Sequence, residues 1–194
     1  MKKSLGLTAV FGVVMLLAVP VTGQAETIDN NSNTTKAVVG LTQDPDSKVE
    51  LTNAPSFDFG STVLTAKGFT PEATIKDDIV VANPGFATGW RVDVSMGPFI
   101  TSDGSDTIKN SLFSIDMGTV TREESSNNSA PPASFSVDPN ENPKPIFQAV
   151  ENEGLGVWHT SYSAKDIRLE IPAGNVSGDY SATMTWTLAE FPAE

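Results

Sequence analysis

In the stretch Gly178–Leu188, "GDYSATMTWTL", the nine residues from Tyr180 to Leu188 alternate without a break between large or apolar side chains and small polar ones. Successive side chains of an extended strand point to opposite faces, so Tyr180, Ala182, Met184, Trp186 and Leu188 share one face. This pattern predicts a half-buried strand whose apolar face packs in a core. We expect the strand to close a β-sandwich, so that truncation after Gly178 unfolds the domain.

A second segment, "GWRVDVSM" at 89–96, has the same design. Trp90 and Val92 share an apolar face, and the polar side chains of Arg91 and Asp93 lie opposite. Each of the two segments thus places a Trp two residues before an aliphatic residue. If the strands lie side by side, the indoles of Trp90 and Trp186 are expected to pack as a cross-strand or diagonal pair.

The remainder of the chain is also strand-like, with short segments rich in Val, Ile, Thr and aromatic residues between Pro, Gly, Asn and Asp. These segments are 37–42, 48–53, 61–66, 73–83, 111–120, 145–150 and 166–171. After residue 25 no window of about 11 residues has helical periodicity. The sequence predicts an all-β domain, an antiparallel β-sandwich that is immunoglobulin-like in a broad sense.

One stretch interrupts this pattern: 121–145, "TREESSNNSAPPASFSVDPNENPKP", is rich in Pro, Ser and Asn. It is expected to be a long surface loop. A loop of this length is unusual in a compact domain and is often functional. Two interpretations stay open, a tolerated insertion and a binding loop.

The N-terminus carries the pattern of a secretory signal peptide. Lys2 and Lys3 precede an apolar run at 5–19, which is shorter than the about 20 residues of a membrane-spanning helix. Small residues at 23 and 25 suit a signal peptidase, so cleavage is expected after Ala25. The alternative is an uncleaved membrane anchor. The expected organisation is a signal peptide at 1–25, a disordered leader at 26–36 and a single β domain at 37–194.

The chain is acidic. Its net charge is −12 at neutral pH, and removal of the signal peptide with its two lysines would lower this to −14. Such a surface repels nucleic acid, anionic lipid and the phosphates of teichoic acid. Nucleic acid is therefore not an expected partner.

The residue inventory gives little basis for catalysis. There is no Cys, and His159 is the only His, so thiolate nucleophiles and Cys- or His-based zinc sites cannot be built. The acidic pairs at 77–78 and 123–124 are typical of solvated turns rather than of a glycosidase. The stretch "TSDGSD" at 101–106 lacks the ligand spacing of an EF-hand and fits ordinary turn chemistry. We expect no enzyme activity, no metal and no cofactor.

The sequence resembles the WxL domain family of Gram-positive surface proteins, which is named for a Trp-x-Leu tripeptide. The tripeptide is "WTL", Trp186–Leu188, and four other blocks agree in order: "PSFDFG" at 55–60, "GWRVDVS" at 89–95, "GLGVW" at 154–158 and "LEIPAG" at 169–174. The first motif copy reads Trp90-Arg91-Val92, with Val in place of Leu, a conservative change for a buried position. The resemblance spans residues 37–192.

This resemblance implies a secreted protein of the Gram-positive cell surface, held non-covalently at the cell wall by binding peptidoglycan. It also implies assembly with a membrane-anchored partner and with other WxL proteins. The alternative function is a structural or adhesive module whose ligand is such a protein or a host extracellular-matrix protein.

The candidate site residues are the two motif pairs and three further aromatic residues. Trp90, Val92, Trp186 and Leu188 are either core or wall-binding residues, and their shared apolar faces favour the core. Trp158 lies in a Gly-rich segment with poor alternation, so we expect an exposed aromatic there. Phe99 and Phe191 are secondary candidates for exposed aromatics.

Overall fold

The computed structural model describes residues 35–191. The chain divides into two units, Met1–Thr42 and Gln43–Glu194. In the first, residues 35–42 hold no strand and are exposed, so the strand expected at 37–42 is wrong. The predicted signal peptide at 1–25 and nearly all of the expected leader at 26–36 lie outside the described residues. Within residues 35–191 no helix is long and apolar enough to cross a membrane.

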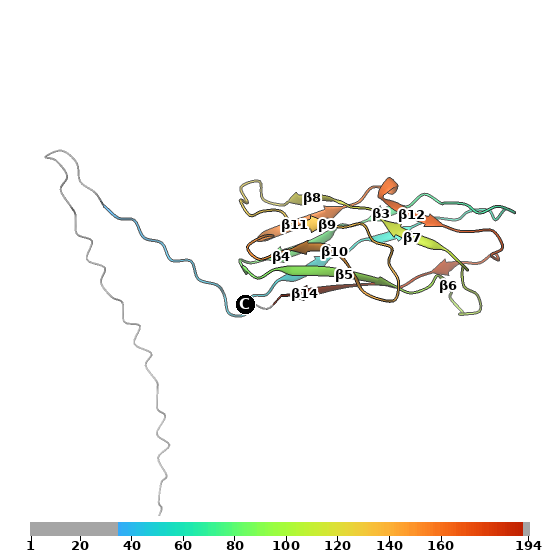
Figure 1. Cartoon of the computed structure of the whole chain (residues 1–194), viewed down its shortest axis with the longest axis horizontal. Coiled ribbons are helices and arrows are strands. Elements are labelled where there is room, and N and C mark those ends of the chain that lie inside the picture. The colour runs from blue at the N-terminus through green and yellow to red at the C-terminus, as the bar shows by residue number, and fades with distance from the viewer. Residues whose placement is uncertain (1–34, 192–194) are drawn as a thin grey trace, which may run out of the picture. The chain divides into compact units, whose positions relative to one another are not determined.

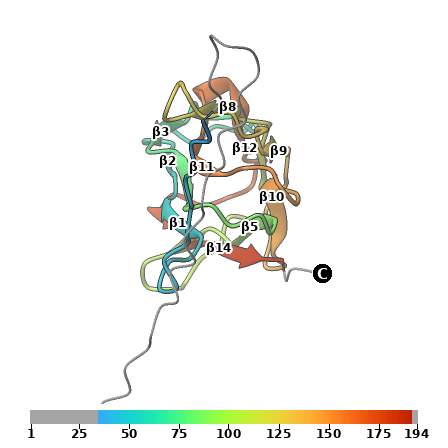
Figure 2. The same cartoon turned by 90° about the vertical axis from the view of Figure 1, so that its left-hand side faces the viewer.

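Two four-stranded sheets form the body of the second unit (Figure 1). One has the order β1 (Glu50–Asn53), β4 (Ile79–Asn83), β11 (Gly156–Ser161) and β8 (Thr119–Arg122). The other has the order β14 (Met184–Glu190), β5 (Trp90–Met96), β10 (Lys144–Ala149) and β9 (Ala133–Ser134). Figure 2 shows β1 and β11 on one side of the domain and β10 and β9 on the other. The predicted all-β antiparallel sandwich is confirmed.

Smaller antiparallel pairs continue the fold beyond the two sheets. They are β2 (Ser56–Asp58) with β3 (Thr74–Lys76), β7 (Leu112–Ile115) with β12 (Ile167–Glu170), and β6 (Ile100–Thr101) with β13 (Tyr180–Ser181). A short 3-10 helix, η1 (Ala164–Asp166), precedes β12. The strands β3, β6, β7 and β12 gather at one end of the domain (Figure 1).

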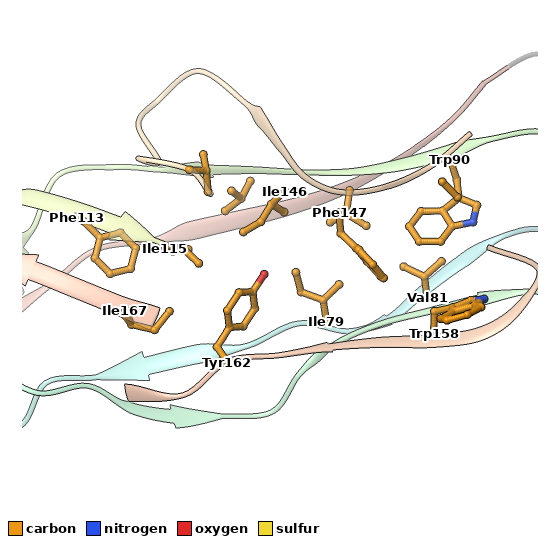
Figure 3. Packing of buried hydrophobic residues seen from close by; sticks show 14 of the residues in the cluster. Ile79, Val81, Trp90, Phe113, Ile115, Ile146, Phe147, Trp158, Tyr162 and Ile167 are labelled. Carbon is orange, nitrogen blue, oxygen red and sulfur yellow. The ribbon is translucent and has the colours of Figure 1, made fainter. Parts of the chain in front are cut away.

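The core lies between the two large sheets, where alternate residues of β4, β5 and β11 are buried. The largest buried side chains are Trp90, Trp158 and Phe147, which point toward the space between the sheets (Figure 3). A register shift in β10 between Pro145 and Phe147 lets the consecutive residues Ile146 and Phe147 both be fully buried. Strand alternation therefore explains most of the core, and one irregularity adds an extra apolar side chain.

The C-terminal stretch forms two strands rather than one, β13 and β14, and β14 pairs with β5 along all seven of its residues. The two Trp-bearing strands thus lie side by side, which is the condition under which the indoles were expected to pack together. In their antiparallel register Leu188 lies opposite Val92, and Trp186 lies opposite Val94.

The predicted indole pair is wrong for a geometric reason. Because the aliphatic residues of the two motifs face each other, Trp90 and Trp186 are four residues apart along the ladder, or about 13 Å. Trp90 instead packs edge-on against Phe147, with ring centroids 5.0 Å apart and an interplanar angle of 72°. Its ring Nε1 donates a hydrogen bond to the Gly154 carbonyl oxygen at 3.2 Å.

The Pro-rich stretch 121–145 is tied to the sandwich and is not a structureless loop. It contains β9, and Pro132, Val137 and Pro139 are buried. Backbone hydrogen bonds connect Val137 with Ile115 in both directions at 2.8 Å. The expectation of one continuous loop is therefore wrong, because buried Pro and Val side chains fasten the segment in several places.

Gly154 lies against the core with φ at +63°, and a Cβ there would meet the Ala149 Cβ at 2.6 Å and the Trp90 ring at 2.9 Å. Gly60 has a similar φ of +59°, but a Cβ there would have open space. An alanine at either position would be strained by the left-handed backbone. Only at Gly154 would its Cβ also overlap neighbouring atoms. We expect Gly154→Ala to lower the free energy of unfolding by about 1–3 kcal/mol more than Gly60→Ala does, measured by urea denaturation. Equal losses would contradict the assigned packing.

Candidate aromatic cleft

A solvent-open cleft of about 950 Å³ lies beyond the central core, at the end where the small strand pairs gather. Its walls come from β2 and the segment that follows it, from the loop between β5 and β6, and from the C-terminal strands. Half-buried aromatic rings line it: Phe57, Phe59, Phe69, Phe99, Tyr180 and Trp186. The cleft therefore combines parts of the chain that are far apart in sequence.

The aromatic floor is organised around Phe113 of β7, which is only 6% exposed. The rings of Phe57, Phe59 and Phe99 lie 5.8, 6.0 and 6.5 Å from the Phe113 ring, all at tilted or edge-on angles. Such edge contacts are favourable arrangements of aromatic pairs. The rings are thus held in place by one another before any ligand arrives.

The C-terminal wall is formed by one face of the stretch on which the fold prediction rests. Tyr180, Ala182, Met184 and Trp186 all line the cleft and are half-buried, and their alternation is as expected. The Tyr180 hydroxyl donates a hydrogen bond to the Val176 carbonyl oxygen at 3.1 Å, which fixes the ring. This face was predicted to be core. In the structure Met184 and Trp186 pack against the core and are also partly exposed to the cleft.

The polar part of the cleft is neutral or acidic. Among residues 35–191 the only charged residues of the lining are Asp58 and Asp179, and both are exposed. One oxygen of Asp58 already accepts a hydrogen bond from the Gly60 amide at 2.8 Å. The uncharged polar residues of the lining are Ser56, Ser61, Thr62, Asn175, Ser177 and Ser181. No Lys or Arg of the described part of the chain lines the cleft, so this lining offers no counter-ion to an anionic group.

The first motif copy lies outside this cleft. Trp90 and Val92 are fully buried in the sandwich core, as their shared apolar face predicted. Leu188 is half-buried opposite Val92. Of the two motif tryptophans, only Trp186 reaches the cleft.

The expectation of an exposed aromatic at Trp158 is wrong, because this residue is 1% exposed. It lies in β11, an inner strand, and its ring Nε1 donates a hydrogen bond to the Leu155 carbonyl oxygen at 2.9 Å. The neighbouring glycines suggested irregular backbone, and Gly154 and Gly156 do adopt positive φ. They shape the turn before the strand without exposing the indole.

The other two candidate aromatics are half-buried. Phe99 lines the cleft against Phe113. Phe191 lies just after β14, with the guanidinium of Arg91 at 5.8 Å from its ring centroid. Arg91 is itself fixed by a two-pronged ion pair with Asp93, at 2.8 and 2.9 Å. The Phe191 ring is therefore in contact with the Arg91 guanidinium, whereas Phe99 lines the cleft.

Sequence reasoning missed Phe57, Phe59 and Tyr180 as site residues. The signal for the first two was present in "PSFDFG", where Phe alternates with small and acidic residues. Alternation places Phe57 and Phe59 on one face, but it does not reveal that this face meets the C-terminal strands.

The turn at 101–106 satisfies its own carboxylate. The Asp103 Oδ1 accepts hydrogen bonds from the Thr101 hydroxyl at 2.7 Å and from the Ser105 amide at 3.1 Å. These hydrogen bonds lower the pKa of Asp103 to about 2. Residues 35–191 contain no cluster of three or more His, Cys, Asp or Glu side chains that could hold a metal ion.

The sandwich and its aromatic cleft together are typical of a ligand-binding β domain. The family described as "WxL domain surface cell wall-binding" matches residues 29–192, and the protein belongs to this family. It is accordingly a surface protein that binds the cell wall. No curated protein and no solved structure matches the chain significantly.

Proposed function

We propose that the protein is secreted by a Gram-positive bacterium and attaches non-covalently to the cell wall by binding peptidoglycan directly, without catalysis, metal or cofactor. The observation that supports this is the cleft, in which the family-motif residue Trp186 lies among half-buried aromatic rings. The first motif copy has no such opening, because Trp90 and Val92 are both fully buried.

Aromatic rings suit a sugar polymer because the C–H faces of a pyranose are apolar while its edges carry hydroxyl groups. The cleft offers rings on its floor and Ser hydroxyls around them. Binding sites of this composition give orientation through a few polar groups and affinity through apolar contact. Such contacts are reversible, which suits a protein that is held without a covalent link.

The first test is co-sedimentation of the purified protein with peptidoglycan sacculi freed of protein and teichoic acid. We expect saturable binding by the wild type and at least about a tenfold weaker affinity for Trp186→Ala and Tyr180→Ala, since aromatic anchors dominate binding surfaces. Leu112→Ala is the matched control, because Leu112 is exposed and does not line the cleft. Circular dichroism would verify that each variant is folded.

Absence of sedimentation at every concentration of folded wild type would contradict direct wall recognition. Equal losses for Leu112→Ala and Trp186→Ala would instead exclude the cleft as the site while leaving wall binding intact.

The edge of β14 favours one alternative function. β14 is an outer strand with an unbroken register to β5, and its only charged residue is Glu190 at its end. A regular edge of this kind can accept a strand from another protein. The alternative is an adhesive or structural module that pairs with a membrane-anchored surface protein, another WxL protein or a host extracellular-matrix protein.

A further inference from the structure

We propose that the cleft selects the uncharged, N-acetylated sugar backbone of the wall and not its carboxylate-bearing stem peptides or phosphate-bearing polymers. This inference rests on the proposed function and names the part of peptidoglycan that occupies the site. Four features of the cleft carry it: its size, its rings, its charge and its apolar rim.

The size of the cleft fits a segment of a chain. Its volume of about 950 Å³ lies near the upper end of the range for small-molecule sites, which is about 300–1,000 Å³. It is open to solvent, and its lining includes exposed residues from both Ser56–Gly60 and Val176–Asp179. The cleft is therefore reached directly from solvent, and it has room for a short segment of a polymer.

The rings are fixed for stacking. Phe57 and Phe99 are held against the buried Phe113, and Tyr180 is held by its hydrogen bond to Val176. A rigid aromatic surface gains contact area with little loss of side-chain entropy. The apolar faces of successive sugars are the part of peptidoglycan that matches such a surface.

The charge excludes the acidic parts of the wall. Asp58 and Asp179 are the only charged residues that the described part of the chain contributes to the lining, and the whole sequence is acidic, with a net charge of −12. A stem-peptide carboxylate or a teichoic phosphate would meet like charges with no Lys or Arg in the lining to offset them. An uncharged glycan meets no such repulsion.

The rim suits acetamido groups. Val63, Leu64 and Val176 border the cleft with exposed fractions of 84%, 39% and 54%. Exposed aliphatic side chains beside a polar site offer contact to an acetyl methyl group, while the Ser hydroxyls can pair with the amide and hydroxyl groups. An unacetylated glucose polymer lacks the methyl groups that these contacts need.

The test is isothermal titration of the purified protein with three soluble probes: a tetramer of β-1,4-linked N-acetylglucosamine, the matched glucose tetramer, and a stem tetrapeptide. We expect binding of the N-acetylated tetramer, at least about tenfold weaker binding of the glucose tetramer, and no binding of the peptide. Affinity for the N-acetylated tetramer should change less than about twofold between about 0.05 and 0.5 M salt, because no ion pair forms.

Variants link the signal to the cleft. Trp186→Ala and Tyr180→Ala should each weaken binding of the N-acetylated tetramer by about tenfold or more. Leu112→Ala again serves as the control.

The outcomes separate this inference from the proposed function. Binding to sacculi without binding to the N-acetylated tetramer, or binding to the stem peptide, would overturn the inference and leave wall attachment standing. If the protein bound neither the sacculi nor the N-acetylated tetramer, both proposals would be overturned. Displacement of the tetramer by an apolar peptide that binds more tightly would also overturn the inference, since the cleft would then be a protein-docking groove.

Discussion

A chain that ends at Gly178 is expected to have no cooperative unfolding transition. This truncation removes β13 and β14, and β14 provides all the neighbours of β5 on one side of the sheet. Val92 and Val94, which are fully buried in the intact domain, would lose the strand that covers that side. A strand of seven residues with its core contacts is worth a large share of the about 5–15 kcal/mol that stabilises a typical domain.

The measurement is thermal and urea denaturation followed by near-UV circular dichroism, which reports the packing of Trp90 and Trp158. A chain that ends at Phe191 is the matched control, because it keeps every described residue of the domain. We expect the control to unfold cooperatively. A sharp transition in the chain that ends at Gly178 would show that the sandwich is stable without its last strand.

Replacement of Trp90 by Ala is expected to lower the free energy of unfolding by about 3–5 kcal/mol, the usual cost of deleting a large buried aromatic. The indole is fully buried, packs edge-on against Phe147 and donates its hydrogen bond to Gly154. Deleting it leaves a cavity and an unpaired buried carbonyl group. For a domain of this size the melting temperature should fall by about 10 °C.

Met117→Ala is the control for Trp90→Ala, since Met117 is 65% exposed and its loss should change stability by less than about 0.5 kcal/mol. The loss of unfolding free energy in Trp186→Ala should lie between those of Trp90→Ala and Met117→Ala, because Trp186 is half-buried. A loss of less than about 1 kcal/mol for Trp90→Ala would contradict the core role assigned to the first motif copy.

Alternation along the chain was sufficient to predict the sandwich, because period-2 patterning fixes which side chains share a face of a strand. It correctly placed Trp90, Val92 and Val94 in the core. It did not establish that the strand that holds them pairs with the C-terminal strand, which the structure shows. It could not give the register of that pair. One consequence was the wrong indole pair, since opposing Leu188 to Val92 separates Trp90 from Trp186.

The candidate site was harder to predict, as Trp158 and Trp186 illustrate. Flanking glycines suggested an exposed indole at Trp158, yet an inner strand and two facing sheets bury it. Trp186 lies on an apolar face whether it is a core residue or a binding residue. No local pattern states whether another sheet covers that face. Burial depends on partners that are distant in sequence.

The sequence by itself determined the all-β class, the family and which residues share a face in the regularly alternating strands, since these follow from local periodicity and ordered motif blocks. Only the tertiary structure decided that one motif copy is sealed in the core while Trp186 opens onto a cleft with Phe57, Phe99 and Tyr180. The reason is that a cleft arises where faces from remote strands meet without a covering layer, and strand order and register set that meeting.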